Sequence, residues 1–325
     1  MRLTKMIAGF ALAASFALPA SAEVITLKFG HVGAPGSLFA ISAEEFAKRV
    51  NTQMAGKVKV EVYGSSQLGK DQELLQKLKL GTVDFSLPSS AMSSVVDQFG
   101  MFDMPYLVKD RSHMGRIESE VFWKNLAPLA ESKGYKVLAV WENGFRHITN
   151  NVHPINVPDD LKGIKLRTPK GKWRVKMFQA YGANPTPMAF SEVFVALQTG
   201  VMDGQENPFA QIASAKFQEV QKYLSLTGHV YTPAYVLVGK NKWNKLPKDV
   251  ASELEAIAKD TQAFVYDTAA AMENDLLGKL KAGGMQVNEA DKAAFVKASA
   301  SIYAEFGTDV AGGKELVDQA LSLAN

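Results

Sequence analysis

Hydrophobic and polar positions follow a regular order in the first third of the chain. Apolar side chains recur at every second position in some segments and at helical spacing in others, which distinguishes strands from helices. The pattern predicts strand, helix, strand, helix and strand in turn, at residues 25–31, 39–54, 58–63, 71–80 and 83–87. This βαβαβ order predicts an α/β fold with a mainly parallel sheet and helices on its faces.

The same patterns continue to the end of the chain. Further strands are predicted at residues 137–141, 164–167 and 235–238, and helices at 173–181, 190–199, 247–280, 293–306 and 314–323. The helix at 247–280 is far longer than an average helix. No repeat, low-complexity tract or proline-rich linker separates two halves. We therefore expect two domains that the chain enters more than once, with a ligand cleft between them.

The N-terminus has the pattern of an export signal. Arg2 and Lys5 precede an apolar stretch at residues 6–18, and small residues follow at 20–22 (ASA). This arrangement is typical of a secretory signal peptide at residues 1–22, cleaved after Ala22. An N-terminal membrane anchor is the alternative, but the stretch is shorter than the roughly 20 residues that a membrane span needs. We expect a mature periplasmic protein with no stable membrane insertion.

Composition and charge exclude several functions. The 325 residues carry 36 Lys and Arg against 33 Asp and Glu, and they include no cysteine. A net charge of +3 gives no support to nucleic-acid binding through a broad cationic face. Without cysteine there can be no disulfide framework, thiolate metal site, cysteine nucleophile or lipoprotein anchor.

Catalytic and cofactor motifs are weak. Residues 64–71 (GSSQLGKD) come close to a phosphate-binding loop, but Asp71 stands where that loop needs a hydroxyl. A glycine turn with Asp71 near a helix N-terminus is the favoured interpretation. The five histidines show no metal-ligand spacing, and no nucleophile motif occurs. We expect no enzyme activity, no metal and no cofactor.

Two arginines follow predicted strands. Arg146 comes soon after the strand at 137–141, and Arg167 ends the strand at 164–167. Open α/β sheets bind ligands at the carboxyl ends of their strands, and a guanidinium can hold a carboxylate through two parallel hydrogen bonds. From the residues alone, a surface arginine paired with a neighbouring acid remains the alternative for each.

Four motifs in order carry a family resemblance, at residues 65–69 (SSQLG), 161–169 (LKGIKLRTP), 185–193 (PTPMAFSEV) and 203–208 (DGQENP). Together they resemble the DctP-type solute-binding protein of a tripartite ATP-independent periplasmic (TRAP) transporter, over essentially the whole mature chain. The resemblance implies a type II-like two-domain periplasmic binding protein whose long helix spans both domains. We divide it into domain I (23–144 and 233–272), domain II (145–232 and 273–300) and a C-terminal helical tail (301–325).

The resemblance also implies a function and a set of site residues. The protein would bind an organic acid and deliver it, as a monomer, to the membrane subunits of a sodium-driven TRAP permease. Arg167 would form the main salt bridge to the ligand carboxylate, Arg146 would be a second cation, and Asn207 would add an amide. Phe190 would pack on the ligand.

Ligand identity is less constrained. Sialic-acid binders of the family carry a glutamate and an arginine where this chain has Ser89 and Met92, which argues against sialic acid. His31, Ser89 and Trp173 are further pocket candidates, although a buried tryptophan is more often part of a core. C4-dicarboxylates, 2-oxo or hydroxy acids, sugar acids and aromatic acids remain.

Two other functions stay open. A sensory protein that presents its ligand to a receptor would share the fold and the pocket, and would differ only in its partner. An exported hydrolase would need a nucleophile and a base within reach, and the chain shows no motif for either.

Overall fold

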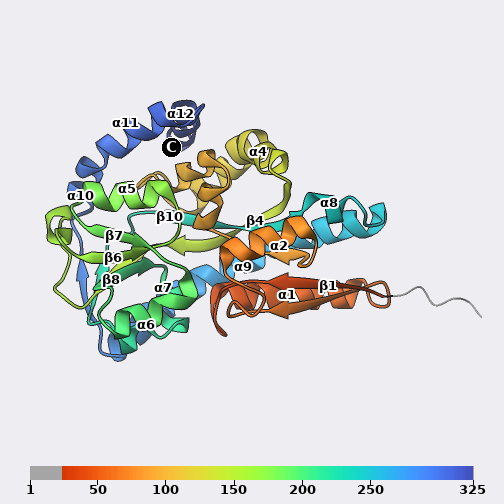
Figure 1. The fold of residues 1–325 in the computed structure, drawn as a ribbon, viewed down its shortest axis with the longest axis horizontal. Coiled ribbons are helices and arrows are strands. Elements are labelled where there is room, and N and C mark those ends of the chain that lie inside the picture. The colour runs from red at the N-terminus through yellow and green to blue at the C-terminus, as the bar shows by residue number, and fades with distance from the viewer. Residues whose placement is uncertain (1–23, 325) are drawn as a thin grey trace, which may run out of the picture.

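The structure, a computed structural model, describes residues 24–324. The predicted signal peptide at residues 1–22 lies outside this range. Eleven strands in this range form two sheets, one of five strands and one of six. We call the five-stranded sheet with its helices the first lobe and the six-stranded sheet with its helices the second lobe (Figure 1).

The first-lobe sheet has the strand order β2-β1-β3-β10-β4. Its strands are β1 (Ile25–Gly30), β2 (Val58–Tyr63), β3 (Phe85–Ser86), β4 (Tyr135–Phe145) and β10 (Tyr231–Gly239). β1 pairs in parallel with β2 and β3, as the βαβαβ pattern predicts. β10 runs antiparallel to both β3 and β4, so the prediction of a mainly parallel sheet is wrong beyond β3.

The second-lobe sheet has the order β11-β9-β5-β8-β6-β7. Its short strands are β5 (His147–Asn150), β6 (Lys165–Thr168), β7 (Asn184–Pro187), β8 (Gly204–Asn207), β9 (Tyr223–Leu226) and β11 (Gln286–Glu289). β6 pairs in parallel with β7 and β8, whereas β5 runs antiparallel to β8 and β9. The carboxyl ends of β6 and β8 therefore share one edge with the start of β5.

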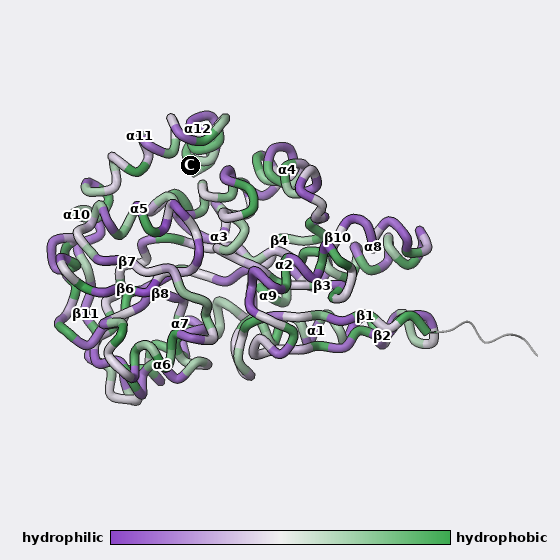
Figure 2. Tube along the Cα trace, in the orientation of Figure 1, coloured by the Kyte–Doolittle hydropathy of each residue, from purple (hydrophilic) through white to green (hydrophobic). Residues whose placement is uncertain are grey.

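Helices cover the sheets and alternate hydrophobic with hydrophilic residues, as α1 and α8 show in Figure 2. The first six α-helices are α1 (Leu38–Gln53), α2 (Asp71–Leu80), α3 (Arg111–Ile117), α4 (Ala127–Ser132), α5 (Lys172–Ala180) and α6 (Val193–Gln198). The next six are α7 (Phe209–Ser214), α8 (Lys240–Trp243), α9 (Lys248–Ala282), α10 (Lys292–Ala298), α11 (Ala300–Asp309) and α12 (Gly313–Ser322).

Shorter helical turns complete the chain. The 3-10 turns are Ser90–Ser94, Asp97–Asp103, Pro158–Leu161, Phe190–Glu192 and Phe217–Glu219, and Glu118–Leu126 forms a π-helical segment between α3 and α4. The turns at 90–103 and the helices up to residue 132 bury Met101, Phe122 and their neighbours against the first lobe. The sequence pattern did not predict these elements.

Three connections tie the lobes together, namely the pair of segments between the two sheets, the helix α9 and the C-terminal segment. The chain leaves the first lobe between β4 and β5 at Arg146 and returns between β9 and β10. The predicted long helix is confirmed as the 35-residue α9, which packs against α1 and β4 of the first lobe and α7 of the second. In the C-terminal segment, α11 packs on α5 of the second lobe, and α12 packs against residues 97–103 and 118–126 of the first. The domain boundaries proposed above remain a prediction.

The turn that resembled a phosphate loop has an ordinary structural cause. Ser65, Ser66 and Gly69 take positive φ angles of 50°, 59° and 128°, and α2 then begins at Asp71. A Cβ at Gly69 would approach Glu73 Oε2 within 2.7 Å, so this position requires glycine. The glycine-turn interpretation is confirmed, with Asp71 in the first turn of the helix.

Candidate functional site

A cavity of about 230 Å³ lies between the lobes. Its lining combines residues that follow the carboxyl ends of first-lobe strands with residues at the shared edge of β5, β6 and β8. Five of the predicted site residues line it, namely Ser89, Arg146, Arg167, Phe190 and Asn207. A crevice at the carboxyl ends of strands is where open α/β sheets bind ligands.

Arg167 is placed on β6 beside Gln205 of β8. Its side chain is only 3% exposed, and its Nε and Nη2 donate to the carbonyl oxygen of Met188 at 3.0 and 2.6 Å. Within residues 24–324 it forms no salt bridge, and its Nη1 has no hydrogen-bond partner. Burial, with Arg146 adding to it, lowers the pKa of Arg167 to about 9. The cavity therefore contains a buried guanidinium that no carboxylate of residues 24–324 neutralises.

Arg146, in contrast, has its own carboxylate. Its Nε donates to Glu206 Oε2 at 2.5 Å, and its Nη2 donates to Glu206 Oε1 and to Asn207 Oδ1, both at 3.0 Å. Arg174 also binds Glu206, at 2.8 and 2.9 Å, and reaches Asp103 of the first lobe at 2.6 Å. Burial alone would raise the pKa of Glu206, but Arg146 and Arg174 hold it well below its ordinary value. Arg146 is thus held in place at the cavity wall, and Glu206 largely neutralises its charge.

Asn207 and Phe190 complete the second-lobe wall. The Asn207 amide oxygen accepts from Arg146, and its amide nitrogen donates to Gln205 Oε1 at 2.6 Å. The Phe190 ring lies 6.0 Å from the guanidinium carbon of Arg167 and 5.9 Å from the Phe217 ring. The wall therefore combines the Arg167 guanidinium, which has no salt bridge within residues 24–324, with the amide of Asn207 and the aromatic face of Phe190.

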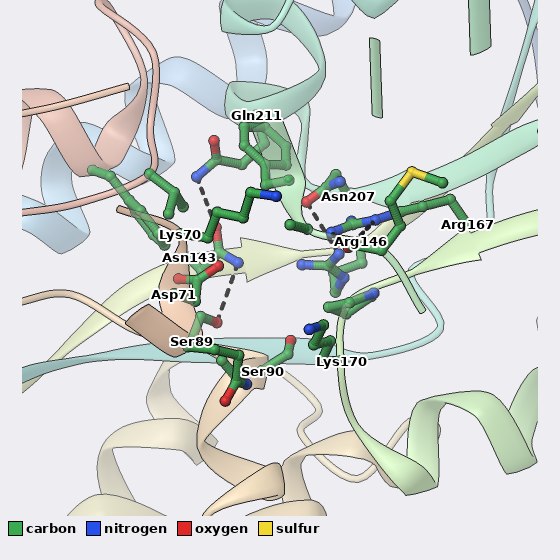
Figure 3. Close-up of a pocket in the computed structure, with 18 of the residues that line it drawn as sticks. Lys70, Asp71, Ser89, Ser90, Asn143, Arg146, Arg167, Lys170, Asn207 and Gln211 are labelled. Carbon is green, nitrogen blue, oxygen red and sulfur yellow. Dashed lines mark hydrogen bonds between the residues drawn. The ribbon is translucent and has the colours of Figure 1, made fainter. Parts of the chain in front are cut away.

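The first-lobe wall has neutral polar groups beside two acids of α2, Asp71 and Glu73. Asn143 donates to Ser89 Oγ at 3.2 Å and accepts from Gln211 Nε2 at 3.3 Å, and Ser89 Oγ donates to the Pro233 carbonyl at 2.7 Å. Asp71, at the start of α2, also lines the cavity. Figure 3 shows Asp71, Asn143 and Ser89 on one side and Arg146 and Arg167 on the other. Burial raises the pKa of Asp71 to about 6, although Arg167 opposes this shift.

Two predicted pocket residues lie elsewhere. Trp173, on α5, is buried against Phe306 with ring centroids 5.0 Å apart, so it belongs to the core between α5 and α11. His31 follows β1 and is 1% exposed, close to the backbone at Gly33 and Gly64. Neither residue lines the cavity. The prediction placed them there because it could not see which face of the sheet or helix each side chain would take.

Several lining residues were not predicted as site residues, among them Lys70, Asp71, Asn143, Lys170, Met188 and Gln211. Asn143 stands in the same N-G-x-R segment as Arg146, and Gln211 lies four residues after Asn207, in the first turn of α7. Asp71 follows the turn after β2, a strand whose carboxyl end faces the same edge as those of β1 and β3. Spacing along the chain could therefore have found these three.

Two further features of the described chain bear on function. Within residues 24–324, none of the helices combines the length and the apolar composition needed to cross a membrane. The same residues contain no cluster of three or more histidine or carboxylate side chains suited to a metal ion.

Comparison with known proteins gives a consistent picture. The model of the family described as "Bacterial extracellular solute-binding protein, family 7" (DctP) matches residues 29–309. The chain is similar to the C4-dicarboxylate-binding periplasmic protein DctP of Rhodobacter capsulatus, with 37% identity over 87% of this chain and 85% of the relative.

Solved structures are similar over nearly their whole length. A TRAP periplasmic solute-binding protein from Bordetella bronchispeptica, with density interpreted as pantoate, is 37% identical with a TM-score of 0.88, covering 92% of this chain and 99% of that one. Another, from Polaromonas sp. JS666 and bound to D-erythronate, is 34% identical with a TM-score of 0.88, covering 92% and 98%.

Proposed function

We propose, from the premise that this chain belongs to the bacterial extracellular solute-binding proteins of family 7, that it binds an organic acid through the acid's carboxylate and delivers it to a TRAP permease. The membership confirms the resemblance drawn from the four motifs, the fold class, the periplasmic location and the expectation of a binding protein rather than an enzyme. The carboxylate contact and the permease are the proposed parts.

The observation that carries the carboxylate contact is the state of Arg167. A buried charge is strongly unfavourable unless a counter-ion and hydrogen bonds compensate for it. Arg146 and Arg174 have such compensation from Glu206 and Asp103, whereas Arg167 has only a carbonyl oxygen. A ligand carboxylate would supply the missing charge and would meet the Nη1 group that lacks a partner among residues 24–324.

The neighbouring groups suit a small acid. Phe190 offers an apolar face beside the guanidinium, and Asn207 is fixed by Arg146 and Gln205. Because hydrogen bonds already hold Asn207, and Phe190 packs against Phe217, little ordering is needed when the ligand binds. The relatives described above are named for or bound to C4-dicarboxylates, pantoate and D-erythronate, all of which carry a carboxylate.

Delivery requires that the lobes open and close. The ligand would enter while the lobes are apart, and the two walls would then enclose it. Lys70 at the start of α2 bonds Glu192 of the second lobe at 2.5 Å, and this contact would be lost when the lobes move apart. The closed, loaded monomer would be the form that the sodium-driven permease subunits recognise.

A thermal-shift comparison of acids with their own amides tests the carboxylate contact. Each carboxylic acid in a library is paired with its primary amide, which keeps the shape and removes the charge. Because a ligand that binds only the folded state raises stability by about 2.7 kcal/mol at 100 times its Kd, the bound acid should raise the Tm by several degrees. Its amide should leave the Tm unchanged. A ligand whose amide shifts the Tm as much as the acid would contradict the proposal.

A further inference from the structure

Asp71 is an acid of the cavity lining that carboxylate capture by Arg167 does not use. It forms no hydrogen bond to another residue and no salt bridge within residues 24–324, although it lines the cavity and is partly buried. Arg167 and Asp71 influence each other electrostatically, yet they are too far apart to pair. The cavity therefore places a free cation on one wall and a free acid on the other.

We propose that Asp71 makes this cavity selective for a polyhydroxylated monocarboxylic acid and disfavours a second carboxylate on the ligand. This inference rests on the proposed function, since it takes the ligand carboxylate to lie on Arg167. A ligand held there directs its other end toward the opposite wall, where Figure 3 places Asp71 with Asn143 and Ser89. A hydroxyl group at that end can donate to the Asp71 carboxylate, whereas a second carboxylate would meet a like charge.

The groups around Asp71 favour hydroxyls over other donors. Asn143, Ser89 and Gln211 form a linked set of neutral amide and hydroxyl groups, which match alcohol groups in both donor and acceptor roles. The lining as a whole also contains four cations, Lys70, Arg146, Arg167 and Lys170, which oppose the entry of a positively charged ligand.

The two lysines do not provide a site for a second carboxylate at the far end. Lys70 already pairs with Glu192. Lys170 follows β6 by two residues and lies on the same side as Arg167 (Figure 3), so it strengthens the first carboxylate site. On α2, Glu73 also lines the cavity and adds a second negative charge near Asp71.

Calorimetric titration with two four-carbon ligands tests the selectivity. D-Erythronate has one carboxylate and three hydroxyls, and succinate has two carboxylates and no hydroxyl. Since a hydrogen bond to a charged group contributes about 1.5–3 kcal/mol, we expect D-erythronate to bind about 10- to 100-fold more tightly than succinate. Asp71→Asn should reduce that ratio at least about tenfold, by weakening D-erythronate and strengthening succinate.

The matched control is Asp97→Asn, which removes the same charge from an exposed position outside the cavity and should leave the ratio unchanged. A wild-type preference for succinate, or an Asp71→Asn ratio equal to that of the wild type, would overturn the selectivity while carboxylate capture stood. Binding of only those acids that lack hydroxyls would likewise overturn the selectivity and leave carboxylate capture standing. Failure of every acid to bind would instead overturn the proposed function together with this inference.

Discussion

The buried arginines Arg146 and Arg167 line the cavity, and a third, Arg174, shares the Glu206 carboxylate with Arg146. The three differ in what neutralises them. Arg146 and Arg174 share Glu206, and Arg174 also has Asp103. Removing Glu206 would leave the buried Arg146 without an acidic partner and Arg174 with Asp103 alone, and the loss of one partner of a buried pair is usually strongly destabilising. Arg167 has no such acid within residues 24–324, so an anion from outside would complete its environment. We therefore expect the ligand carboxylate to bind Arg167, the one of these three arginines that has no acidic partner within residues 24–324.

Asp71 should affect stability in a pH-dependent way. Burial raises its pKa from 3.8 to about 6 in the folded state, so the folded protein binds this proton more tightly than the unfolded chain does. The ionised form therefore destabilises the fold above pH 6, and this destabilisation disappears as the pH falls toward 4. At pH 7 Asp71→Asn should stabilise the ligand-free protein by about 1 kcal/mol, after allowance for partial exposure and for a helix N-terminus that favours an anion.

Differential scanning calorimetry of both proteins at pH 7 and pH 4.5 would measure this difference. The gain in Tm should be largest at pH 7 and fall to about a third of that value at pH 4.5, and Asp97→Asn should show no such trend. A variant that melts below the wild type at pH 7 would contradict the assignment of Asp71 as a partly buried, unpaired acid.

Sequence reasoning located some of these residues and missed the roles of others. Arg167 could be found because a strand end marks the ligand edge of an α/β sheet. The partner of Arg146 is Glu206, 60 residues away, and single-chain spacing cannot show that pairing. Trp173 was misplaced for the same reason, because its neighbour Phe306 comes from a helix near the C-terminus. The environments of Arg146 and Trp173 therefore both depend on contacts with residues that are distant in the sequence.

At the level of elements, the start of α2 links the fold to the cavity. The turn at residues 64–70 uses positive φ angles to bring the chain from β2 into α2. This places Lys70 and Asp71 on the cavity wall. Lys70 then reaches Glu192 in the 3-10 turn of the second lobe. The start of α2 thus contributes both Asp71, the acid proposed to select the ligand, and a contact between the lobes.

Breaking the Lys70–Glu192 contact should weaken closure only slightly. The two side chains are 42% and 49% exposed, and exposed ion pairs contribute about 0.2–1 kcal/mol. Glu192→Gln should therefore speed ligand dissociation by about two- to fivefold, with less effect at high salt. Stopped-flow measurements at low and high salt would test this, with Asp318→Asn, which breaks an exposed pair on α12, as the control. A loss of binding altogether would show that the contact is structural.

Long, regular patterns of apolar positions identified the elements that contribute most of the hydrophobic core. The parallel unit β1–α1–β2–α2–β3 and the helix α9 were predicted because their apolar positions repeat over many residues. β5 (HITN) and β8 (GQEN) were missed because they bury polar side chains that satisfy one another, as Gln205 does with Thr149 at 2.9 Å. Such strands lack the alternation of apolar and polar residues on which the prediction depends.

At the scale of the whole molecule, the two lobes share one cavity and three connections. α9 contacts both lobes, and the C-terminal helices run from α5 back to the first lobe. Charged groups from both lobes also meet at Arg174, which binds Asp103 and Glu206. These ties would guide the lobes back to the same closed arrangement, in which Arg167 faces Asp71.

The most direct measurement of the central claim is calorimetric titration of Arg167→Ala with the acid that the thermal-shift comparison identifies. Loss of a buried charge pair typically costs 2–5 kcal/mol, so affinity should fall by at least about 30-fold. Arg167→Lys should recover only part of it, because lysine cannot form the two parallel hydrogen bonds. The ligand-free Tm should not fall, and Arg49→Ala, at an arginine outside the cavity, should bind normally. Wild-type affinity in Arg167→Ala would contradict the account.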